Sequence, residues 1–324
     1  MPPWAIHRHK RCGARGARRT PAGKNKKPHA FSRMRPLEFL LACAPAMPAP
    51  ENRNDWLTVA ALGLLATCIV TFDHEALGHG SACLLLHGHI RLLSSSLFRC
   101  DVRSGWIDPA GPATNLLVGT LALVCLRFVP ERLLNFRLLL ILITAFSYFW
   151  ESGYVMRAML RRDGDLYYFA QFLLGDVSVW QRCVAAGAGL ALFVFAARLT
   201  SNALLKLWPQ TRTARAVART AWTAAIVGSA AAALAYAGPG WSGNLRDAVL
   251  EVGAASFPLL LIPPRNRPIE TTQPPAFIAR STITIVLALA VYAIFVATLG
   301  RGLISPAAVA APQPPAAPAA QHPL

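Results

Sequence analysis

The chain has few charged residues for its length. Asp, Glu, Lys and Arg together make up 15% of its 324 residues, whereas soluble globular proteins carry about 25%. The hydrophobic share is 54%. These two values disfavour a soluble globular protein, and they predict an integral membrane protein whose length is used mainly for membrane spans.

Paired-cysteine motifs and internal repeats are also missing. No two of the seven cysteines form a Cys-x-x-Cys pair, so the sequence contains no metal or redox motif of that type. No self-similar unit of about 20 to 50 residues is evident. Because several cysteines lie within apolar runs, we expect them to act as small hydrophobic side chains in helices. They are Cys12, Cys43, Cys68, Cys83, Cys100, Cys125 and Cys183.

Acidic residues are absent from the N-terminal segment. Residues 1–37 hold eleven Lys or Arg and no Asp or Glu. Such a segment cannot bury enough apolar surface to fold, so 1–55 is predicted to be a disordered basic arm. Aromatic residues do not interleave with the basic ones, which disfavours nucleic-acid binding and favours contact with anionic lipid or with nothing. Met34 and Met47 stand closer to the first apolar segment, so a start there is an alternative.

Apolar stretches of about 20 residues, the length that crosses a bilayer as helix, follow the arm. The sequence therefore predicts an all-α, polytopic fold with six to seven transmembrane helices in contact with the lipid bilayer. A short aromatic helix at 165–174 is expected at the membrane interface, and the Pro- and Ala-rich end 301–324 is predicted to be unstructured. The predicted spans are 56–86, 109–128, 136–156, 183–199, 216–236 and 282–299, with a weaker seventh at 248–262.

Polar residues gather near the end of the first span, in FDHEALGHGSA (72–82). Ionisable side chains at membrane depth cost at least a few kcal/mol, so Asp73, His74, Glu75 and His79 together indicate a functional site. Two imidazoles bind zinc, and an adjacent carboxylate takes a proton from the water that the metal acidifies. The competing interpretation is a helix end at the headgroup level, where these side chains are simply solvated.

The spacing of this motif differs from the zinc-protease signature His-Glu-x-x-His by one residue. Residues five apart on a regular helix are displaced by about 140°, so His74 and His79 could not share one ion there. A one-residue π-bulge widens the turn and removes the conflict, and Gly78 makes the distortion easier. The alternative keeps the helix regular and pairs Glu75 with His79, leaving His74 outside the ligand set. We favour the bulge.

Three further segments resemble the site-2 protease-like intramembrane metalloproteases. AGPATNLLVG (110–119) looks like the Gly-Pro-x-x-Asn element of that family, and LLLHGHIRLLSSSLFRC (84–100) is similar to the β-like stretch that precedes it in bacterial members. YVMRAMLRRDGDLYYF (154–169) supplies the Asp next to Gly that ends the third core span. The resemblance covers 56–174, which would be the membrane core, and 175–300 would add further helices.

The resemblance implies a ligand set and a chemistry. His74 and His79 would bind Zn²⁺ with a third ligand, either Asp163 or Asp165; we favour Asp165 slightly. The first and third spans run in the same direction, so these residues reach the same membrane face. Glu75 would be the general base.

Asn115 lies within the second span, where its amide needs partners. The functional interpretation is a hydrogen bond to the substrate backbone or to the oxyanion, and the structural one is a bond to a neighbouring helix. We expect Glu151 either to support the site or to relay protons, with a purely structural role as the alternative. Asp108 is expected to be a helix cap, and His87 and His89 are expected to be solvated.

The predicted function is hydrolysis of peptide bonds in a transmembrane protein or peptide substrate. A catalytically inactive scaffold of the same fold and a metal-ion carrier are the alternatives. The expected location is the bacterial inner (plasma) membrane. The basic arm favours a cytoplasmic N-terminus with the site facing outward, whereas without the arm the arginines at 91–103 and 157–162 would pull the site inward.

Overall fold

Helices make up most of the part of the chain that the computed structural model describes, residues 54–238, 240–263 and 276–304. The predicted basic arm, apart from its last two residues, and most of the Pro- and Ala-rich end lie outside these ranges, as do Cys12 and Cys43. The helices are α2 (Trp56–Phe72), η1 (Asp73–Gly80), α3 (Ser81–Leu85), α4 (Ala110–Cys125), α5 (Leu134–Arg161), α6 (Asp165–Leu174), α7 (Val179–Leu207), α8 (Thr211–Leu234), α9 (Trp241–Ala248), η2 (Val249–Ala254), η3 (Phe257–Leu260), α10 (Thr282–Phe295) and η4 (Val296–Gly300). η1, η2 and η4 are π-helical, and η3 is a 3₁₀ helix.

Five of the described helical segments are long and apolar enough to cross a membrane, namely Trp56–Leu85, Leu134–Arg161, Val179–Leu207, Thr211–Leu234 and Thr282–Gly300. The prediction of six to seven such helices is therefore confirmed only in its coarser form. The predicted span at 109–128 is the shorter helix Ala110–Cys125. The weak seventh span is not one helix, because η2 and η3 interrupt it with a π turn and a 3₁₀ turn. The protein thus has the helical architecture of a membrane protein.

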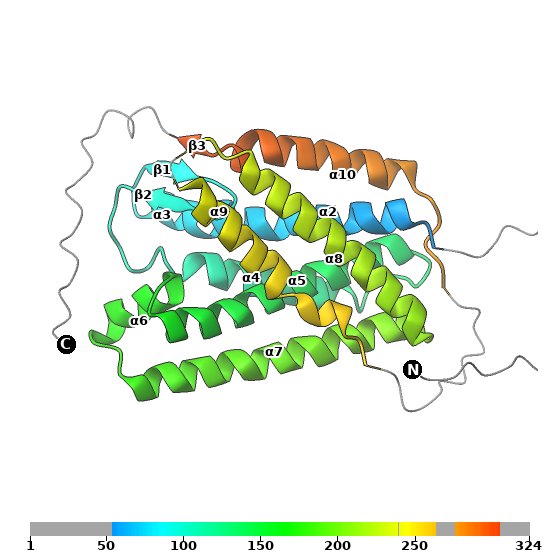
Figure 1. Ribbon diagram of the computed structural model, residues 1–324, viewed down its shortest axis with the longest axis horizontal. Helices are drawn as coiled ribbons and strands as arrows, with labels where there is room; N and C mark the ends of the chain where they lie inside the picture. The colour runs from blue at the N-terminus through cyan, green and yellow to red at the C-terminus, as the bar shows by residue number, and fades with distance from the viewer. Residues whose placement is uncertain (1–53, 239, 264–275, 305–324) are drawn as a thin grey trace, which may run out of the picture. The chain divides into compact units, whose positions relative to one another are not determined.

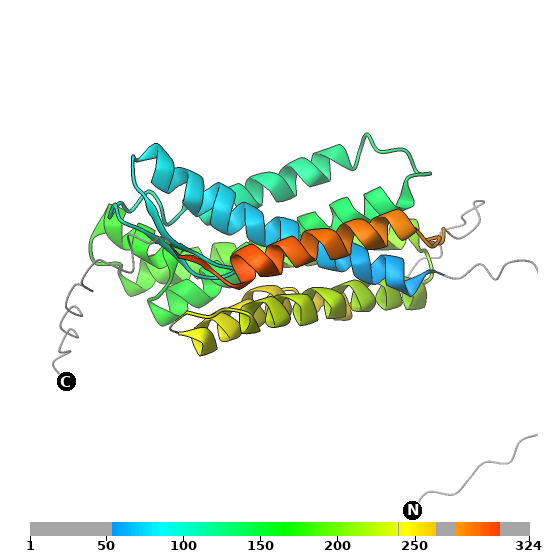
Figure 2. The same cartoon turned by 90° about the horizontal axis from the view of Figure 1, so that it is seen from above.

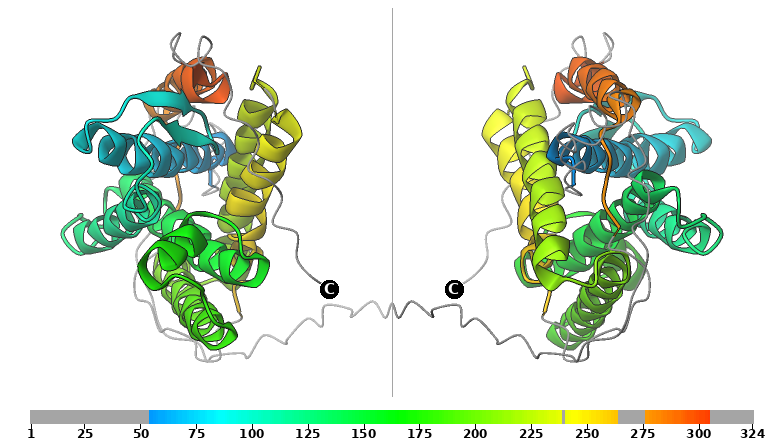
Figure 3. Two further views of the ribbon diagram at one scale, coloured as in Figure 1. Left: turned by 90° about the vertical axis from the view of Figure 1, so that its left-hand side faces the viewer. Right: turned by 90° about the vertical axis from the view of Figure 1, so that its right-hand side faces the viewer.

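Helix α5 lies at the centre of this bundle. It packs against α2, α4 and α7, while α8 and α10 pack against other sides of α2. Figure 1 shows the long helices side by side, and Figure 2 shows α10 alongside α2 from above. In the end-on views of Figure 3, α8 and α9 lie to one side of α2 and α5. Most of the residues of α5 are buried, which leaves it shielded from lipid.

Small side chains allow α2 and α8 to approach closely. A Cβ atom on Gly63 would lie 2.3 Å from the carbonyl oxygen of Ala221, so the two backbones touch in the manner typical of helices packed within a membrane. Helix α2 begins at a defined point, because the carboxylate of Asp55 accepts a 2.8 Å hydrogen bond from the backbone N–H of Thr58. This contact fixes where the first span starts, and η1 then continues it at the opposite end.

A small antiparallel sheet makes the fold mostly helical rather than all-α. Its strand order is β2 (Phe98–Cys100), β1 (Ile90–Leu93), β3 (Leu303–Ile304). Within the β-like segment 84–100, residues 90–100 form a hairpin, while Leu84 and Leu85 end helix α3. It lies at the same end of the bundle as α3 and α6 (Figure 1). The predicted helical class is thus confirmed in its coarser form, and the sheet was not predicted because the partner strand β3 comes from about 200 residues further along the chain, beyond any local pattern.

The prediction for the cysteines was wrong in one respect. Cys83 in α3 and Cys100 in β2 form a disulfide across a sequence separation of 17. The hairpin folds Cys100 back over α3, a long-range contact that no short cysteine motif announces. Cys68, Cys125 and Cys183 are free and lie in helices, as expected. The disulfide ties the hairpin to the end of the first span.

Candidate metal centre

The first span ends in a π-helical turn that includes both histidines of the motif. η1 covers Asp73–Gly80, and within it the Nε2 atoms of His74 and His79 lie 3.2 Å apart. A π turn has more residues per turn than an α turn, so side chains five apart come to the same side. The wide turn predicted from the spacing is confirmed. The regular-helix alternative, in which His74 points elsewhere, is not what the structure shows.

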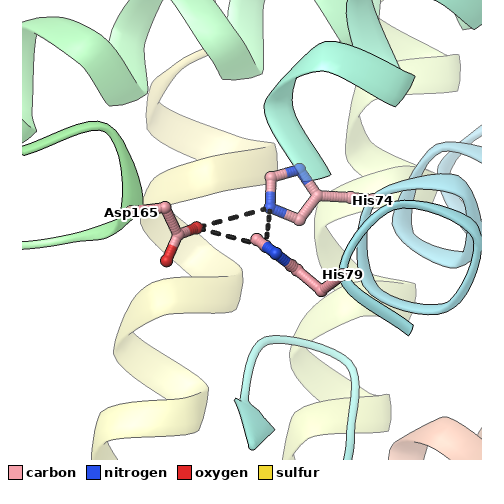
Figure 4. Close-up of side chains that lie close together, drawn as sticks. All are labelled: His74, His79 and Asp165. Atoms are coloured by element: carbon pink, nitrogen blue, oxygen red, sulfur yellow. Dashed lines mark hydrogen bonds and ion pairs between the residues drawn. The ribbon is translucent and has the colours of Figure 1, made fainter. Parts of the chain in front are cut away.

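Asp165 completes the cluster from the start of α6. One of its carboxylate oxygens, Oδ2, lies 3.2 Å from Nε2 of His79 and 3.8 Å from Nε2 of His74. Figure 4 shows the three side chains pointing toward one another from η1 and from the start of α6. Asp163 is not part of this group, since it accepts a 2.7 Å hydrogen bond from the hydroxyl of Tyr168. Of the two aspartates, the structure brings only Asp165 to the histidines.

The tautomers of both histidines follow from their outer contacts. Nδ1 of His79 lies 2.8 Å from the carbonyl oxygen of Ile107, which can only accept a hydrogen bond. Nδ1 of His74 lies 3.0 Å from the Glu151 carboxylate. Each Nδ1 therefore carries the proton and donates it outward. This leaves the two Nε2 atoms as bases that face each other, the arrangement found in metal-binding histidines.

Two facing lone pairs and a carboxylate oxygen within 4 Å of one another repel unless a cation or a proton lies between them. Zinc is bound by histidine nitrogen and carboxylate oxygen at about 2.0 to 2.2 Å in a tetrahedron, so its ligand atoms lie about 3.3 Å apart. The observed separations are 3.2, 3.2 and 3.8 Å. The cluster therefore fits a zinc ion with three protein ligands and leaves the fourth position open.

Aromatic rings hold the two imidazoles in place. Trp150 of α5 stacks on His74 with ring centroids 4.7 Å apart and an interplanar angle of 9°. Phe98 of β2 covers His79 at 5.5 Å. Both rings limit the rotation of the imidazoles and exclude water from their flanks. The hairpin and α5 therefore both help to shape the site.

Glu151 and Asn115 lie on the Nδ1 side of the His74 ring, away from the Nε2 atom that faces His79. Asn115 is fully buried, and its amide nitrogen donates a 2.8 Å hydrogen bond to the same Glu151 oxygen that contacts His74. This placement favours a positioning role for Asn115 over contact with the substrate. Glu151 therefore contacts His74 as a support for the site would, which is one of the roles predicted for it.

Glu75 is buried and faces the cleft that contains the histidines and Asp165. The cleft has a volume of about 190 Å³ and is lined by charged side chains from α5, α9 and η2 as well. Arg157 crosses it with ion pairs of 3.1 Å to Asp247 and 3.0 Å to Glu251. Glu75 is therefore next to the candidate ligands without being one of the group.

Two acids outside the spans have pKa values that reflect this environment. Asp108 lines the cleft, and burial, followed by the charge of Asp165, raises its pKa to about 6. It is not the helix cap that the sequence predicted, because α4 begins after Pro109 and has no side-chain cap. Burial raises the pKa of Asp165, but hydrogen bonds and positive charge from His74 and His79, when these imidazoles are protonated, hold that pKa well below the usual value.

His87 and His89 are not in the cluster. The His89 side chain is 80% exposed and contacts Asp101 at 3.1 Å. Cys83, Cys100 and Asp101 form a second close group, but two sulfurs joined as a disulfide are not thiolate ligands. Among the described residues, His74, His79 and Asp165 thus form the one metal-sized group whose ligand atoms are all available.

No protein-family model, curated protein or solved structure matches this chain.

Proposed function

We propose that this protein is an intramembrane zinc metalloprotease that hydrolyses peptide bonds in membrane-embedded protein or peptide substrates. The observation that carries the proposal is the convergence of two Nε2 atoms and one carboxylate oxygen beside a buried glutamate. The spacing and order of the motifs resemble those of the site-2 proteases, and this resemblance supports the same chemistry. The proposed location is the bacterial inner membrane.

The residues of the chain have separate roles in this proposal. A zinc ion held by His74, His79 and Asp165 would acidify a water molecule and polarise the scissile carbonyl. Glu75 would accept the proton of the attacking water and then deliver it to the leaving amine. Glu151 would keep His74 in the tautomer that binds metal. A substrate helix must unwind locally at the cleft, since a helical carbonyl is hydrogen-bonded and shielded.

Metal content tests the proposal. The full chain, purified in mild detergent and supplied with zinc, is expected to hold one zinc ion per chain by mass spectrometry. Asp165→Asn should weaken zinc binding by more than the roughly 10- to 100-fold that is lost with a residue that only supports a ligand, whereas Asp163→Asn, two residues earlier, should leave it unchanged. Equal losses in both variants, or no zinc in either the wild type or the variants, would overturn the ligand assignment.

Zinc binding alone does not separate a protease from a carrier, so the reconstituted protein needs two assays. Cleavage of single-span peptides without zinc flux across vesicles supports the protease. Zinc flux without cleavage would replace it with a carrier that uses the same ligands. Zinc without either activity would leave a scaffold that keeps the fold and the metal.

The disulfide supports a membrane orientation. The Cys83–Cys100 bond joins α3 to β2, and Phe98 of the same strand covers His79, so the bond and the metal centre lie at one end of the bundle. Disulfides persist in the periplasm or outside the cell and are rare in the cytosol. The disulfide therefore supports an orientation with the site in the outer leaflet and the start of α2 on the cytoplasmic side, which is also the orientation that the basic arm favours.

A thiol-labelling experiment checks this orientation. In a background in which Cys12, Cys43, Cys68, Cys125 and Cys183 are all replaced by Ala, Cys83 and Cys100 are expected to resist a maleimide polyethylene glycol reagent until a reductant is added. A strain without disulfide-forming enzymes should show both thiols labelled without reductant. Labelling before reduction in the normal strain contradicts the orientation and leaves the zinc assignment standing.

A further inference from the structure

A group of arginines gathers at the end of the bundle opposite to the metal centre. Arg212, Arg215 and Arg219 lie at the start of α8 with spacings of three and four, which places them on one helix face. Together with Trp56 and Thr220 they line an open pocket of about 610 Å³. Trp56 begins α2, whose other end continues into η1, so the pocket and the zinc cluster lie at opposite ends of the same span. We propose that this pocket binds the headgroup of an anionic phospholipid.

The positive charge in the pocket is not neutralised by the described part of the chain. None of the ion pairs found between described residues involves Arg212, Arg215 or Arg219. Their hydrogen bonds go instead to neutral carbonyls, from Nε of Arg215 to Ile262 at 2.7 Å and from Arg219 to Leu260 at 3.3 Å. Each guanidinium has five N–H donors, so most donors remain available to an anion.

Asp55, a described acid at this end of the bundle, is already engaged. Asp55 accepts hydrogen bonds from the backbone N–H and the hydroxyl of Thr58, at 2.8 and 2.7 Å, and so caps α2. The bond to Ile262 fixes the Arg215 side chain, which is half-buried, while Arg212 and Arg219 are exposed on either side of it. A phosphate group is the anion whose geometry matches a guanidinium cluster, because its oxygens accept paired hydrogen bonds from arginine.

The position of the pocket favours a lipid over a free phosphate. It lies where spans begin, so a phospholipid in the surrounding leaflet would present its headgroup at this level. Trp56, which is 46% exposed, is the kind of aromatic residue that sits at the headgroup level. The pocket volume is within the range of about 300 to 1,000 Å³ of ordinary ligand sites. The leaflet on the cytoplasmic side is also the one whose surface attracts basic clusters.

Phosphatidylglycerol titrated into the full-length protein in neutral detergent tests this proposal, with bound lipid counted by native mass spectrometry. The wild type is expected to bind phosphatidylglycerol in preference to phosphatidylcholine of the same acyl chains. Arg212→Gln/Arg219→Gln should weaken that binding by about tenfold or more, since each basic residue near a membrane surface contributes several-fold. Arg215 is left in place because it also holds Ile262.

The matched control removes two exposed arginines at the same end of the bundle. Arg127→Gln/Arg132→Gln, in the connection between α4 and α5, should change the affinity by less than about threefold. Equal losses in the two double variants would show diffuse surface charge and overturn the site. Equal binding of phosphatidylglycerol and phosphatidylcholine by the wild type would also overturn the site, and this measurement does not depend on the folding of any variant. Displacement of the lipid by millimolar inorganic phosphate would show that the pocket takes a free phosphate instead. Every one of these outcomes is independent of zinc and of proteolysis.

Discussion

Glu75→Gln is expected to lower peptide cleavage by about 100- to 10,000-fold, the contribution usual for a general base, while the protein keeps its zinc. The amide has nearly the shape of the carboxylate, but it cannot accept the proton of the attacking water. Glu75 is buried beside His74 and His79 and is not one of the grouped ligand atoms. Cleavage of single-span peptides in vesicles and zinc per chain by mass spectrometry, measured on the same preparation, check both halves of the prediction.

The two measurements together separate the possible roles of this residue. Glu131→Gln, at an exposed position in the connection that precedes α5, is the matched control and should change neither quantity. Loss of zinc in Glu75→Gln would show that Glu75 is a ligand, as the regular-helix alternative requires. Full activity with zinc retained would assign proton transfer to another group, of which Asp108 in the same cleft is the nearest candidate.

The wide turn of η1 could be predicted because the two histidines that would have to bind the same ion lie close together in the sequence. Two histidines five apart serve one ion only if the turn is widened, and both residues are on the same helix, so no distant information is needed. The choice between Asp163 and Asp165 was different. Arg162 and Gly164 adopt positive φ values of 59° and 94°, and this reversal of the chain turns Asp165 toward the histidines. Local sequence identifies the loop but not which of its two acids faces inward.

Contacts between distant segments account for the features that sequence analysis missed. The third strand, the disulfide and the bond between Asn115 and Glu151 each join residues that lie 17 to about 210 positions apart. Hydrophobic pattern located the long helices, because each of them is apolar over a length that can cross a membrane. It marked 248–262 only as a weaker span and did not show that η2 and η3 divide this segment.

Gly111→Ala is expected to remove the bound zinc. A Cβ atom at this position would lie 2.4 Å from Nε2 of His79 and 2.8 Å from Nε2 of His74, the two atoms that face the proposed ion. A zinc ion needs about 2.0 to 2.1 Å to each of these nitrogens, so the new methyl group and the ion would occupy the same space. Helix α4 cannot easily move aside, because Gly111 also packs on Gly78, where a Cβ would lie 2.4 Å from the Gly111 Cα.

Gly187→Ala is the matched control for this substitution. It changes a helical glycine in α7 that has no heavy atom within 4 Å of the added carbon, so it should keep its zinc and gain slightly in stability, by about 1 kcal/mol or less. Zinc per chain after size-exclusion chromatography distinguishes the two variants, and circular dichroism checks that both remain helical. A folded Gly111→Ala protein that keeps stoichiometric zinc would mean that the ion binds away from the two Nε2 atoms. A glycine at the start of α4 is thus part of the metal centre through the volume it leaves open.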